Sequence, residues 1–176
     1  MATDAQSPSL NLREEEMHLA SIEIGGMTKG ADCGFLAGND VGHFTAFVNE
    51  TGGILIGSYS EDSSTARIVE ATTRPVDSLA GRTTFQRGVR GLRPLLHARW
   101  KTGLYYVGEW HFHPGGSPEP SGDDFRSMTS IAANPDYQCL EPVMIILGGD
   151  PAGSYSLSAS VFPRGDAPIR LREILI

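Results

Sequence analysis

Cysteine is scarce in this chain, and its scarcity excludes two kinds of stabilised scaffold. Only two cysteines, Cys33 and Cys139, occur among 176 residues, and no CxxC pair is present. A disulfide framework or a thiolate zinc knuckle needs cysteines paired at short spacing. We therefore expect a reduced, cytoplasmic protein whose fold rests on an apolar core.

Long apolar runs and an excess of positive charge are also missing. No stretch approaches the 18 or more apolar residues of a membrane span, and the first residues lack the basic-then-apolar pattern of a secretory signal. The 14 basic residues are outnumbered by 21 acidic ones, which gives a net charge of −7. Nucleic-acid binding rests on neutralising phosphates, so this charge argues against a nucleic-acid partner. The missing apolar run argues against a membrane partner.

What is present is the composition of an ordinary globular protein, with 40% apolar and 20% charged residues. A chain of this length buries about 70% of its unfolded surface when it folds. We expect one domain over residues 1–176, with the polar stretch 1–16 loosely attached. Strand and helix patterns are mixed along the chain, which indicates an α/β layer fold.

Apolar periodicity places the expected elements. Strand patterns are found at residues 21–24, 54–56, 66–71, 142–149 and 156–162, the last of them alternating as a half-exposed strand does. A helix is expected to begin near Phe85 behind a threonine cap, to be bent or interrupted at Gly91 and Pro94, and to have a second piece through Trp100. A second helix is expected to end at Asn134-Pro135, and the apolar tail 169–176 is expected to dock.

Residues 79–108 contain no acidic side chain but six basic ones, namely Arg82, Arg87, Arg90, Arg93, Arg99 and Lys101. One interpretation is a solvated helix face whose apolar side packs on the sheet. The other is a docking surface for an acidic protein. The sequence favours the first without excluding the second.

The stretch YYVGEWHFHPGGSPEPSGDDFRSM, residues 105–128, carries the candidate chemistry. Its start is rich in strand-forming residues, and side chains two apart on a strand share a face, so His111 and His113 lie side by side. A Pro/Gly-rich loop then leads to Ser121 and Asp124 at the start of a helix. Two imidazoles and one carboxylate suit zinc, and three protein ligands leave a fourth position open for water, as in catalytic sites.

His111-x-His113, seven residues and Ser121-x-x-Asp124 resemble the signature of the JAMM metallopeptidases, the JAB/MPN family. The upstream run Glu50-Thr-Gly-Gly-Ile-Leu-Ile-Gly57 is similar to the glutamate strand of that family. The resemblance spans about residues 45–150. It implies a three-layer, cytidine-deaminase-like α/β fold in which helices flank a central mixed sheet.

The resemblance also implies a role for each residue. His111, His113 and Asp124 would hold one zinc ion, Glu50 would pass a proton from the attacking water to the departing amine, and Ser121 would support the oxyanion. Glu50 precedes His111 by 61 positions (111 − 50), so only the fold can join them.

Several residues have a second interpretation. Ser121 with Asp124 also matches a capping box, and Glu50 can be an exposed turn residue. Glu109 shares the strand parity of the histidines and is an alternative ligand or an acceptor for an imidazole N–H. Asp123 is expected to point away from Asp124 around the helix.

The chain departs from the family pattern in two places. The family usually has a small residue between its two histidines, where this chain has Phe112, which we expect in the core. The first family helix is not evident in residues 41–48, where His43 is expected at the surface or half-buried rather than as a ligand.

JAMM enzymes mostly cleave after the C-terminal tail of ubiquitin or a ubiquitin-like protein. The runs GGILIGSY and YVGEWHFHP are most similar to the deconjugating peptidases of CBASS antiphage operons, whose substrate is a nucleotidyltransferase conjugated through its C-terminus. The resemblance thus implies a protein substrate with an extended tail. Processing of a ubiquitin-like or sulfur-carrier protein and a non-catalytic MPN scaffold are the alternatives. A nucleoside deaminase would need a PCxxC ligand pair, which is absent.

Overall fold

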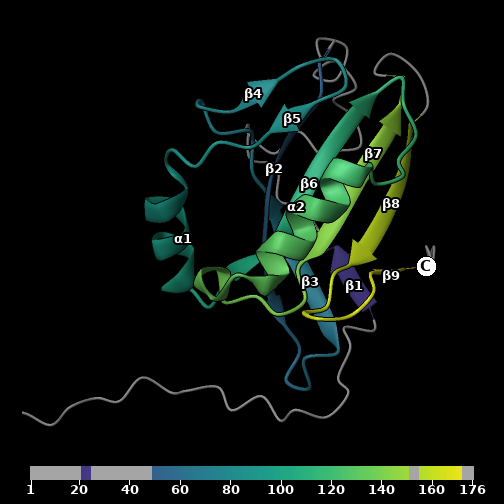
Figure 1. Ribbon diagram of the computed structural model, residues 1–176. Coiled ribbons are helices and arrows are strands. Elements are labelled where there is room, and N and C mark those ends of the chain that lie inside the picture. The colour runs from purple at the N-terminus through teal and green to yellow at the C-terminus, as the bar shows by residue number, and fades with distance from the viewer. Residues whose placement is uncertain (1–20, 25–48, 151–154, 172–176) are drawn as a thin grey trace, which may run out of the picture.

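The computed structural model describes residues 21–24, 49–150 and 155–171, and its centre is a seven-stranded sheet of order β1-β3-β2-β6-β7-β8-β9 (Figure 1). The strands of this sheet are β1 (Ser21–Ile24), β2 (Thr51–Tyr59), β3 (Thr65–Ala71), β6 (Tyr105–Pro114), β7 (Val143–Gly149), β8 (Tyr155–Val161) and β9 (Ile169–Arg170). The remaining elements are the hairpin of β4 (Leu79–Ala80) and β5 (Phe85–Gln86), the helices α1 (Leu92–Trp100) and α2 (Gly122–Ala133), and the short 3-10 helix η2 (Pro135–Tyr137). Parallel pairs β1–β3 and β6–β7 stand among antiparallel ones, so the predicted mixed α/β sheet is confirmed.

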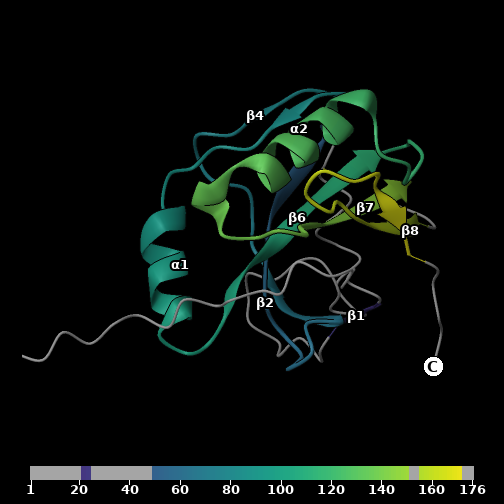
Figure 2. The ribbon, with the colours of Figure 1, turned by 60° about the horizontal axis from the view of Figure 1, so that its bottom comes forward.

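Apolar side chains fill both faces of the central strands. Trp110 and Phe112 of β6 belong to a buried cluster on one face, as their strand parity predicted. The opposite face carries Ile54 and Ile146 and is covered by Met128 of α2 and the leucines of α1. In Figure 2, α2 crosses this face and α1 stands beside it. Burial on both faces explains why β2 and β7 are continuous apolar runs in the sequence.

The expected strands at 21–24, 54–56, 66–71 and 142–149 are all present. The strand expected at 156–162 is present as β8, but its exposure differs from the prediction. Ser158 and Ser160 of β8 are buried, although their polarity suggested an exposed face. The Ser158 hydroxyl donates to the Pro118 carbonyl in the loop after β6, so a hydrogen bond compensates the buried oxygen. The prediction of a half-exposed strand was therefore wrong from Ser158 onward, whereas Ser156 is exposed as expected.

The helix expected to begin near Phe85 was also predicted wrongly. Phe85 and Gln86 pair with β4 as a strand, and α1 begins only at Leu92, after Gly91 in a left-handed conformation at φ 85°. Pro94 lies in the first helical turn, where backbone N–H groups have no partner within the helix. It therefore lies at the start of the helix rather than at a bend, and the expected piece through Trp100 is confirmed as α1.

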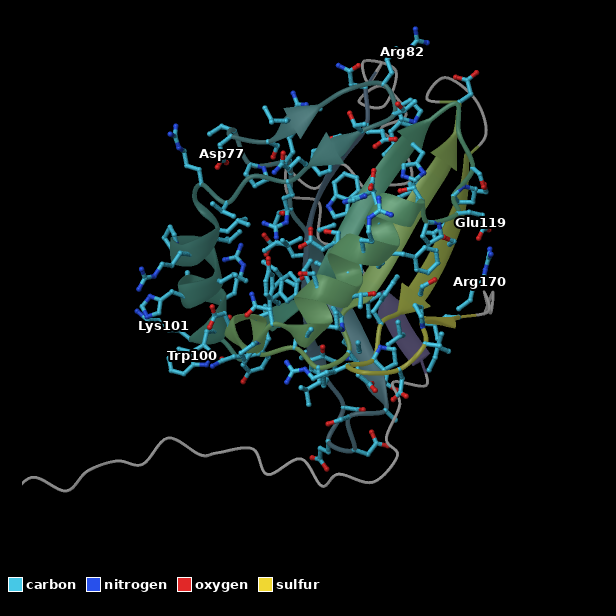
Figure 3. The ribbon with its side chains drawn as sticks, in the orientation of Figure 1. Asp77, Arg82, Trp100, Lys101, Glu119 and Arg170 are labelled. Carbon is cyan, nitrogen blue, oxygen red and sulfur yellow. The ribbon has the colours of Figure 1, made fainter. Side chains whose placement is uncertain are left out.

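The outer face of α1 is exposed, with Trp100 61% exposed and stacked on His97. Figure 3 shows Trp100 and Lys101 at the end of α1, away from the sheet. Only Leu92, Leu95 and Leu96 of the expected apolar side reach the core, and they do so partially. The helix thus packs on the core along one narrow side. Its use as a docking surface for an acidic protein stays a prediction.

Among the described residues, none of the helices has both the length and the apolar character needed to span a bilayer. The predictions for residues 1–16, Cys33, the 41–48 segment with His43, and the end of the tail fall outside the described residues. Ile169 and Leu171 of the tail do pack against the core.

Candidate metal centre

Strand β6 presents the histidine pair at its C-terminal end. His111 is buried and His113 half-buried, and their rings lie 6.5 Å apart between centroids, on the sheet face opposite to Phe112. This arrangement follows from strand alternation. Phe112 is 2% exposed and packs in the core, as predicted.

The start of α2 brings a carboxylate to the two rings. Ser121 is the N-cap, its hydroxyl accepting from the Asp124 backbone N–H, and the Asp124 carboxylate accepts in return from the Ser121 backbone N–H at 2.7 Å. This capping box turns the Asp124 side chain back toward β6, where it is buried. Asp123 lies in solvent and pairs with Arg126, so it points away as expected.

His111, His113 and Asp124 each contribute a ligand atom, and these atoms all lie within 4.8 Å of one another. The Asp124 carboxylate is 2.9 Å from His111 Nδ1 and 3.8 Å from His113 Nε2. Two ligand atoms on one zinc ion lie at most about 4.2 Å apart, twice the Zn–N distance. The two distances involve different oxygens of Asp124, and the shorter one is a hydrogen bond from His111 Nδ1. The donor set suits a single divalent ion by its chemistry and proximity, with this hydrogen bond given up when the ion binds.

The tautomer of His113 is fixed by a backbone carbonyl. Nδ1 lies 3.0 Å from the Ser117 carbonyl oxygen, which can only accept, so Nδ1 carries the hydrogen. The lone pair is then on Nε2, the atom that faces Asp124. Backbone carbonyls commonly orient ligating histidines in this way. The Ser117 carbonyl had no signal in the sequence.

The pairing of β2 with β6 places Glu50 near the two histidines. The antiparallel pairing of β2 with β6 sets Thr51 opposite Phe112 and Gly52 opposite His111, so Glu50, one residue earlier, lies alongside His113. The charges of both histidines and of Asp124 act on its carboxyl group. The fold thus brings together residues that are 61 positions apart (111 − 50).

The electrostatics of the two carboxyl groups differ. Burial raises the pKa of Asp124, but hydrogen bonds from His111 and Ser121 outweigh it and lower that pKa to about 2. Burial raises the pKa of Glu50 above its ordinary value, with the Asp124 charge adding to the rise and the histidines opposing it. Asp124 is therefore a permanent anion, whereas Glu50 is the stronger proton acceptor.

Glu109, weighed as an alternative ligand, is engaged elsewhere. Its carboxylate accepts from Arg87 Nε at 2.6 Å and from the Tyr106 hydroxyl at 3.1 Å. Within the described residues, the group of potential metal ligands comprises only His111, His113 and Asp124. Neither role considered for Glu109 is seen.

Two further residues shape the site without a signal in the sequence. The Phe85 ring packs edge-on against His111, with centroids 5.2 Å apart. Gly52 lies under the same imidazole, where an added Cβ would stand 2.7 Å from His111 Cδ2 and 2.3 Å from the Trp110 carbonyl oxygen. Gly52 thus permits the close approach of β2 to the imidazole.

Fold and site together define the class: an α/β protein with a candidate metal centre at the end of a mixed sheet. Residues 42–159 match the family described as prokaryotic homologs of the JAB domain, and the chain belongs to this family.

Named relatives and a solved structure are similar to this chain. A protein of Enterobacter hormaechei subsp. hoffmannii (strain UCI 50), named CD-NTase/cGAS isopeptidase, is 95% identical over 131 residues, which are 74% of this chain and 73% of that protein. A protein of the same name from Pseudomonas aeruginosa (strain BWHPSA011 / Pa011) is 33% identical over 88 residues, 48% of this chain and 54% of that one. The solution structure of protein DSY2949 from Desulfitobacterium hafniense covers 89% of this chain and 92% of its own, at 16% identity and a TM-score of 0.58, and supports the fold alone.

Proposed function

We propose that this chain is a zinc-dependent isopeptidase that releases a protein conjugated through its C-terminal tail in a ubiquitin-like manner. The conjugated protein would be a CD-NTase, and the setting a CBASS antiphage operon. The observation that carries the proposal is the convergence of the His111, His113 and Asp124 ligand atoms with Glu50 at one end of the sheet. The name of the 95% identical relative supports the substrate.

His111, His113 and Asp124 would hold the ion. Zinc, when bound, polarises the scissile carbonyl and lowers the pKa of water towards 7. The Ser117 carbonyl keeps His113 Nε2 free of a hydrogen, and Ser121 holds the Asp124 carboxylate in place. These two ligands are thus oriented before the substrate arrives.

Glu50 would act as the general base and then as the general acid. One proton must leave the attacking water as its oxygen bonds to the carbonyl carbon, and one must reach the amine as the C–N bond breaks. A half-buried carboxylate with a raised pKa accepts and returns this proton more readily than an ordinary one. The products are a free C-terminal carboxylate and a free amine.

Ser121 would support the oxyanion. Its hydroxyl hydrogen donates to Asp124 Oδ2 at 2.7 Å, and rotation about the C–O bond can redirect that hydrogen without moving the oxygen. The oxygen can therefore go on accepting from the Asp124 N–H, so the cap and the proposed role are compatible.

The experiment is a gel-based cleavage assay with two substrates, a CD-NTase conjugated to a target and a ubiquitin-like precursor. We expect cleavage of the conjugate, loss of cleavage with a chelator, and recovery with zinc. Preferential cleavage of the precursor would instead favour processing of ubiquitin-like proteins. Partner binding without cleavage of either substrate would favour the scaffold.

A further inference from the structure

A buried ion pair joins the end of the β4–β5 hairpin to β6, the strand that carries His111 and His113. Arg87 Nε lies 2.6 Å from Glu109 Oε2, and the two side chains are only 11% and 5% exposed. Tyr106 donates to the second Glu109 oxygen at 3.1 Å, and Arg87 donates to the Tyr137 hydroxyl at 3.3 Å and to the Gly88 carbonyl at 2.9 Å. The charges are therefore held in one orientation by several hydrogen bonds.

Stability alone gives little reason for such a pair. Desolvating two charges costs about as much as their attraction returns, and apolar replacements of similar volume are often neutral or stabilising. A buried pair does, however, fix the direction of both side chains, because the guanidinium and the carboxylate bond only along defined lines.

The two segments that the pair joins both touch the proposed site. Glu109 is two residues before His111 on the same strand face, and Arg87 directly follows β5. The hairpin packs Phe85 against the His111 ring and accepts the Glu50 backbone N–H on the Gly81 carbonyl at 2.8 Å. In Figure 1, the hairpin lies at the same end of the sheet as the C-terminal end of β6.

We propose that Arg87 and Glu109 form a positioning pair, which seats the hairpin on β6 so that Phe85 sets the His111 ring and Gly81 sets the Glu50 backbone. Neither residue touches the substrate or the ion. The proposal rests on the proposed function for its effect on turnover, but its effect on the His111 ring does not require turnover. A misplacement of about 1 Å at a catalytic group can cost about 10²-fold in rate.

The test is the double variant R87M/E109Q, which removes both charges at nearly constant volume and keeps an acceptor for Tyr106. We expect a melting temperature near that of the wild type. We also expect zinc affinity, measured by competition with a chromophoric chelator, to fall about 10-fold, the lower end of the loss caused by removing a direct partner of a metal ligand, because this pair acts through the hairpin. The kcat is expected to fall by a similar factor with KM nearly unchanged.

A second Arg–Glu pair supplies the matched control. Arg99 of α1 and Glu70 of β3 have the same 2.6 Å contact in a more exposed setting, with side chains 37% and 27% exposed, and their side chains hydrogen-bond to each other. R99M/E70Q is expected to leave kcat and zinc affinity unchanged. The conservative variant R87K, which keeps the charge, should recover part of the activity that R87M/E109Q loses.

Wild-type kcat and zinc affinity in R87M/E109Q would overturn the proposal. So would losses that simply follow a lowered melting temperature and are not relieved in R87K. If the wild type itself cleaves nothing, the proposal is tested by the nuclear Overhauser contact between the Phe85 and His111 rings. Its loss in R87M/E109Q supports the pair as a positioning device, and its persistence contradicts it.

Discussion

At the scale of single residues, the Asp124 carboxylate organises the site. One oxygen contacts His111, and the other accepts from the Ser121 backbone and hydroxyl. Burial opposes its charge, yet these contacts lower its pKa to about 2, so it is ionised at neutral pH. The Asp124 side chain thus belongs both to the capping box and to the proposed ligand set, which ties the position of α2 to the proposed metal centre.

Replacing Ser121 with alanine separates the two roles of its hydroxyl. Loss of the cap should reduce the free energy of unfolding by about 1 kcal/mol. Loss of an oxyanion donor should reduce kcat by about 10²–10³-fold. Urea unfolding and steady-state kinetics measure the two effects, with S130A on the exposed side of the same helix as control. Small, equal losses in both measurements would indicate that Ser121 is a cap alone.

The residues that converge were predictable because each has a distinctive chemical type at a fixed spacing. Two histidines in alternation, and a serine three residues before an aspartate, carry their geometry in the sequence. Phe85, Arg87 and the Ser117 carbonyl were not predictable. An aromatic ring, an arginine in a basic stretch and a backbone oxygen occur everywhere, and only the fold brings them to the site.

At the scale of elements, the pairing of β2 with β6 places Glu50 beside the histidines. This pairing is close because β2 has glycines opposite His111 and Trp110. An added Cβ at Gly53 would stand 2.3 Å from the Thr72 carbonyl oxygen, and one at Gly52 would strike the imidazole. The glycines therefore serve both the sheet and the site.

G52A should displace the His111 ring and lower zinc affinity. Overpacking of this kind costs about 1–3 kcal/mol in unfolding free energy. Zinc titration and chemical denaturation measure both effects. G122A, at the first residue of α2, has only an Arg126 nitrogen at 3.4 Å to meet and should be neutral or slightly stabilising. Unchanged zinc affinity in G52A would show that the imidazole does not depend on this close approach.

The segment between β5 and α1 is held by Asp77, whose carboxylate accepts from the Val89 and Arg90 backbone N–H groups at 3.1 and 3.0 Å. Figure 3 shows Asp77 beside this segment. The two hydrogen bonds lower the pKa of Asp77 below its ordinary value. Since the folded pKa is depressed, the contact contributes fully above the unfolded pKa and is lost as pH falls through the folded one.

Amide hydrogen exchange at Val89 and Arg90 checks this prediction. Protection of both amides should fall in D77N at neutral pH, and in the wild type at a pH below the depressed pKa. D62N, which removes a similar carboxylate from the β2–β3 turn, should leave these two amides unchanged. Protection that is independent of both pH and Asp77 would contradict the contact.

The strands were more predictable than α1 for a physical reason. Buried strands show as runs of apolar residues, whereas the hairpin that replaced the expected helix start has only two residues in each strand. These short strands are held against the rest of the fold by contacts of Phe85 with His111, Gly81 with Glu50 and Arg87 with Glu109. Local propensity cannot indicate contacts of this range.

At the scale of the whole molecule, the folded core does not depend on the proposed ion. Apolar residues of five or more strands and both helices form the two buried clusters, and the three candidate ligands lie at one end of the sheet rather than inside either cluster. Small zinc domains that unfold without metal lack such cores. The ion would thus serve catalysis rather than folding.

Metal removal should therefore abolish activity and leave the fold intact. After chelation, the circular dichroism spectrum and cooperative unfolding should persist, and stoichiometric zinc should restore turnover. The melting temperature should fall moderately, because an ion that binds only the folded state stabilises it. Loss of secondary structure on chelation would instead indicate a structural ion.

The most direct measurement compares zinc content and turnover in wild-type protein and E50Q. The glutamine keeps the shape of Glu50 but cannot carry the proton, so we expect E50Q to retain one zinc ion per chain and a wild-type melting temperature. Its kcat is expected to fall about 10²–10⁴-fold. Near-wild-type turnover in zinc-loaded E50Q, or absence of zinc from the wild type under replete conditions, would contradict a metal centre served by Glu50.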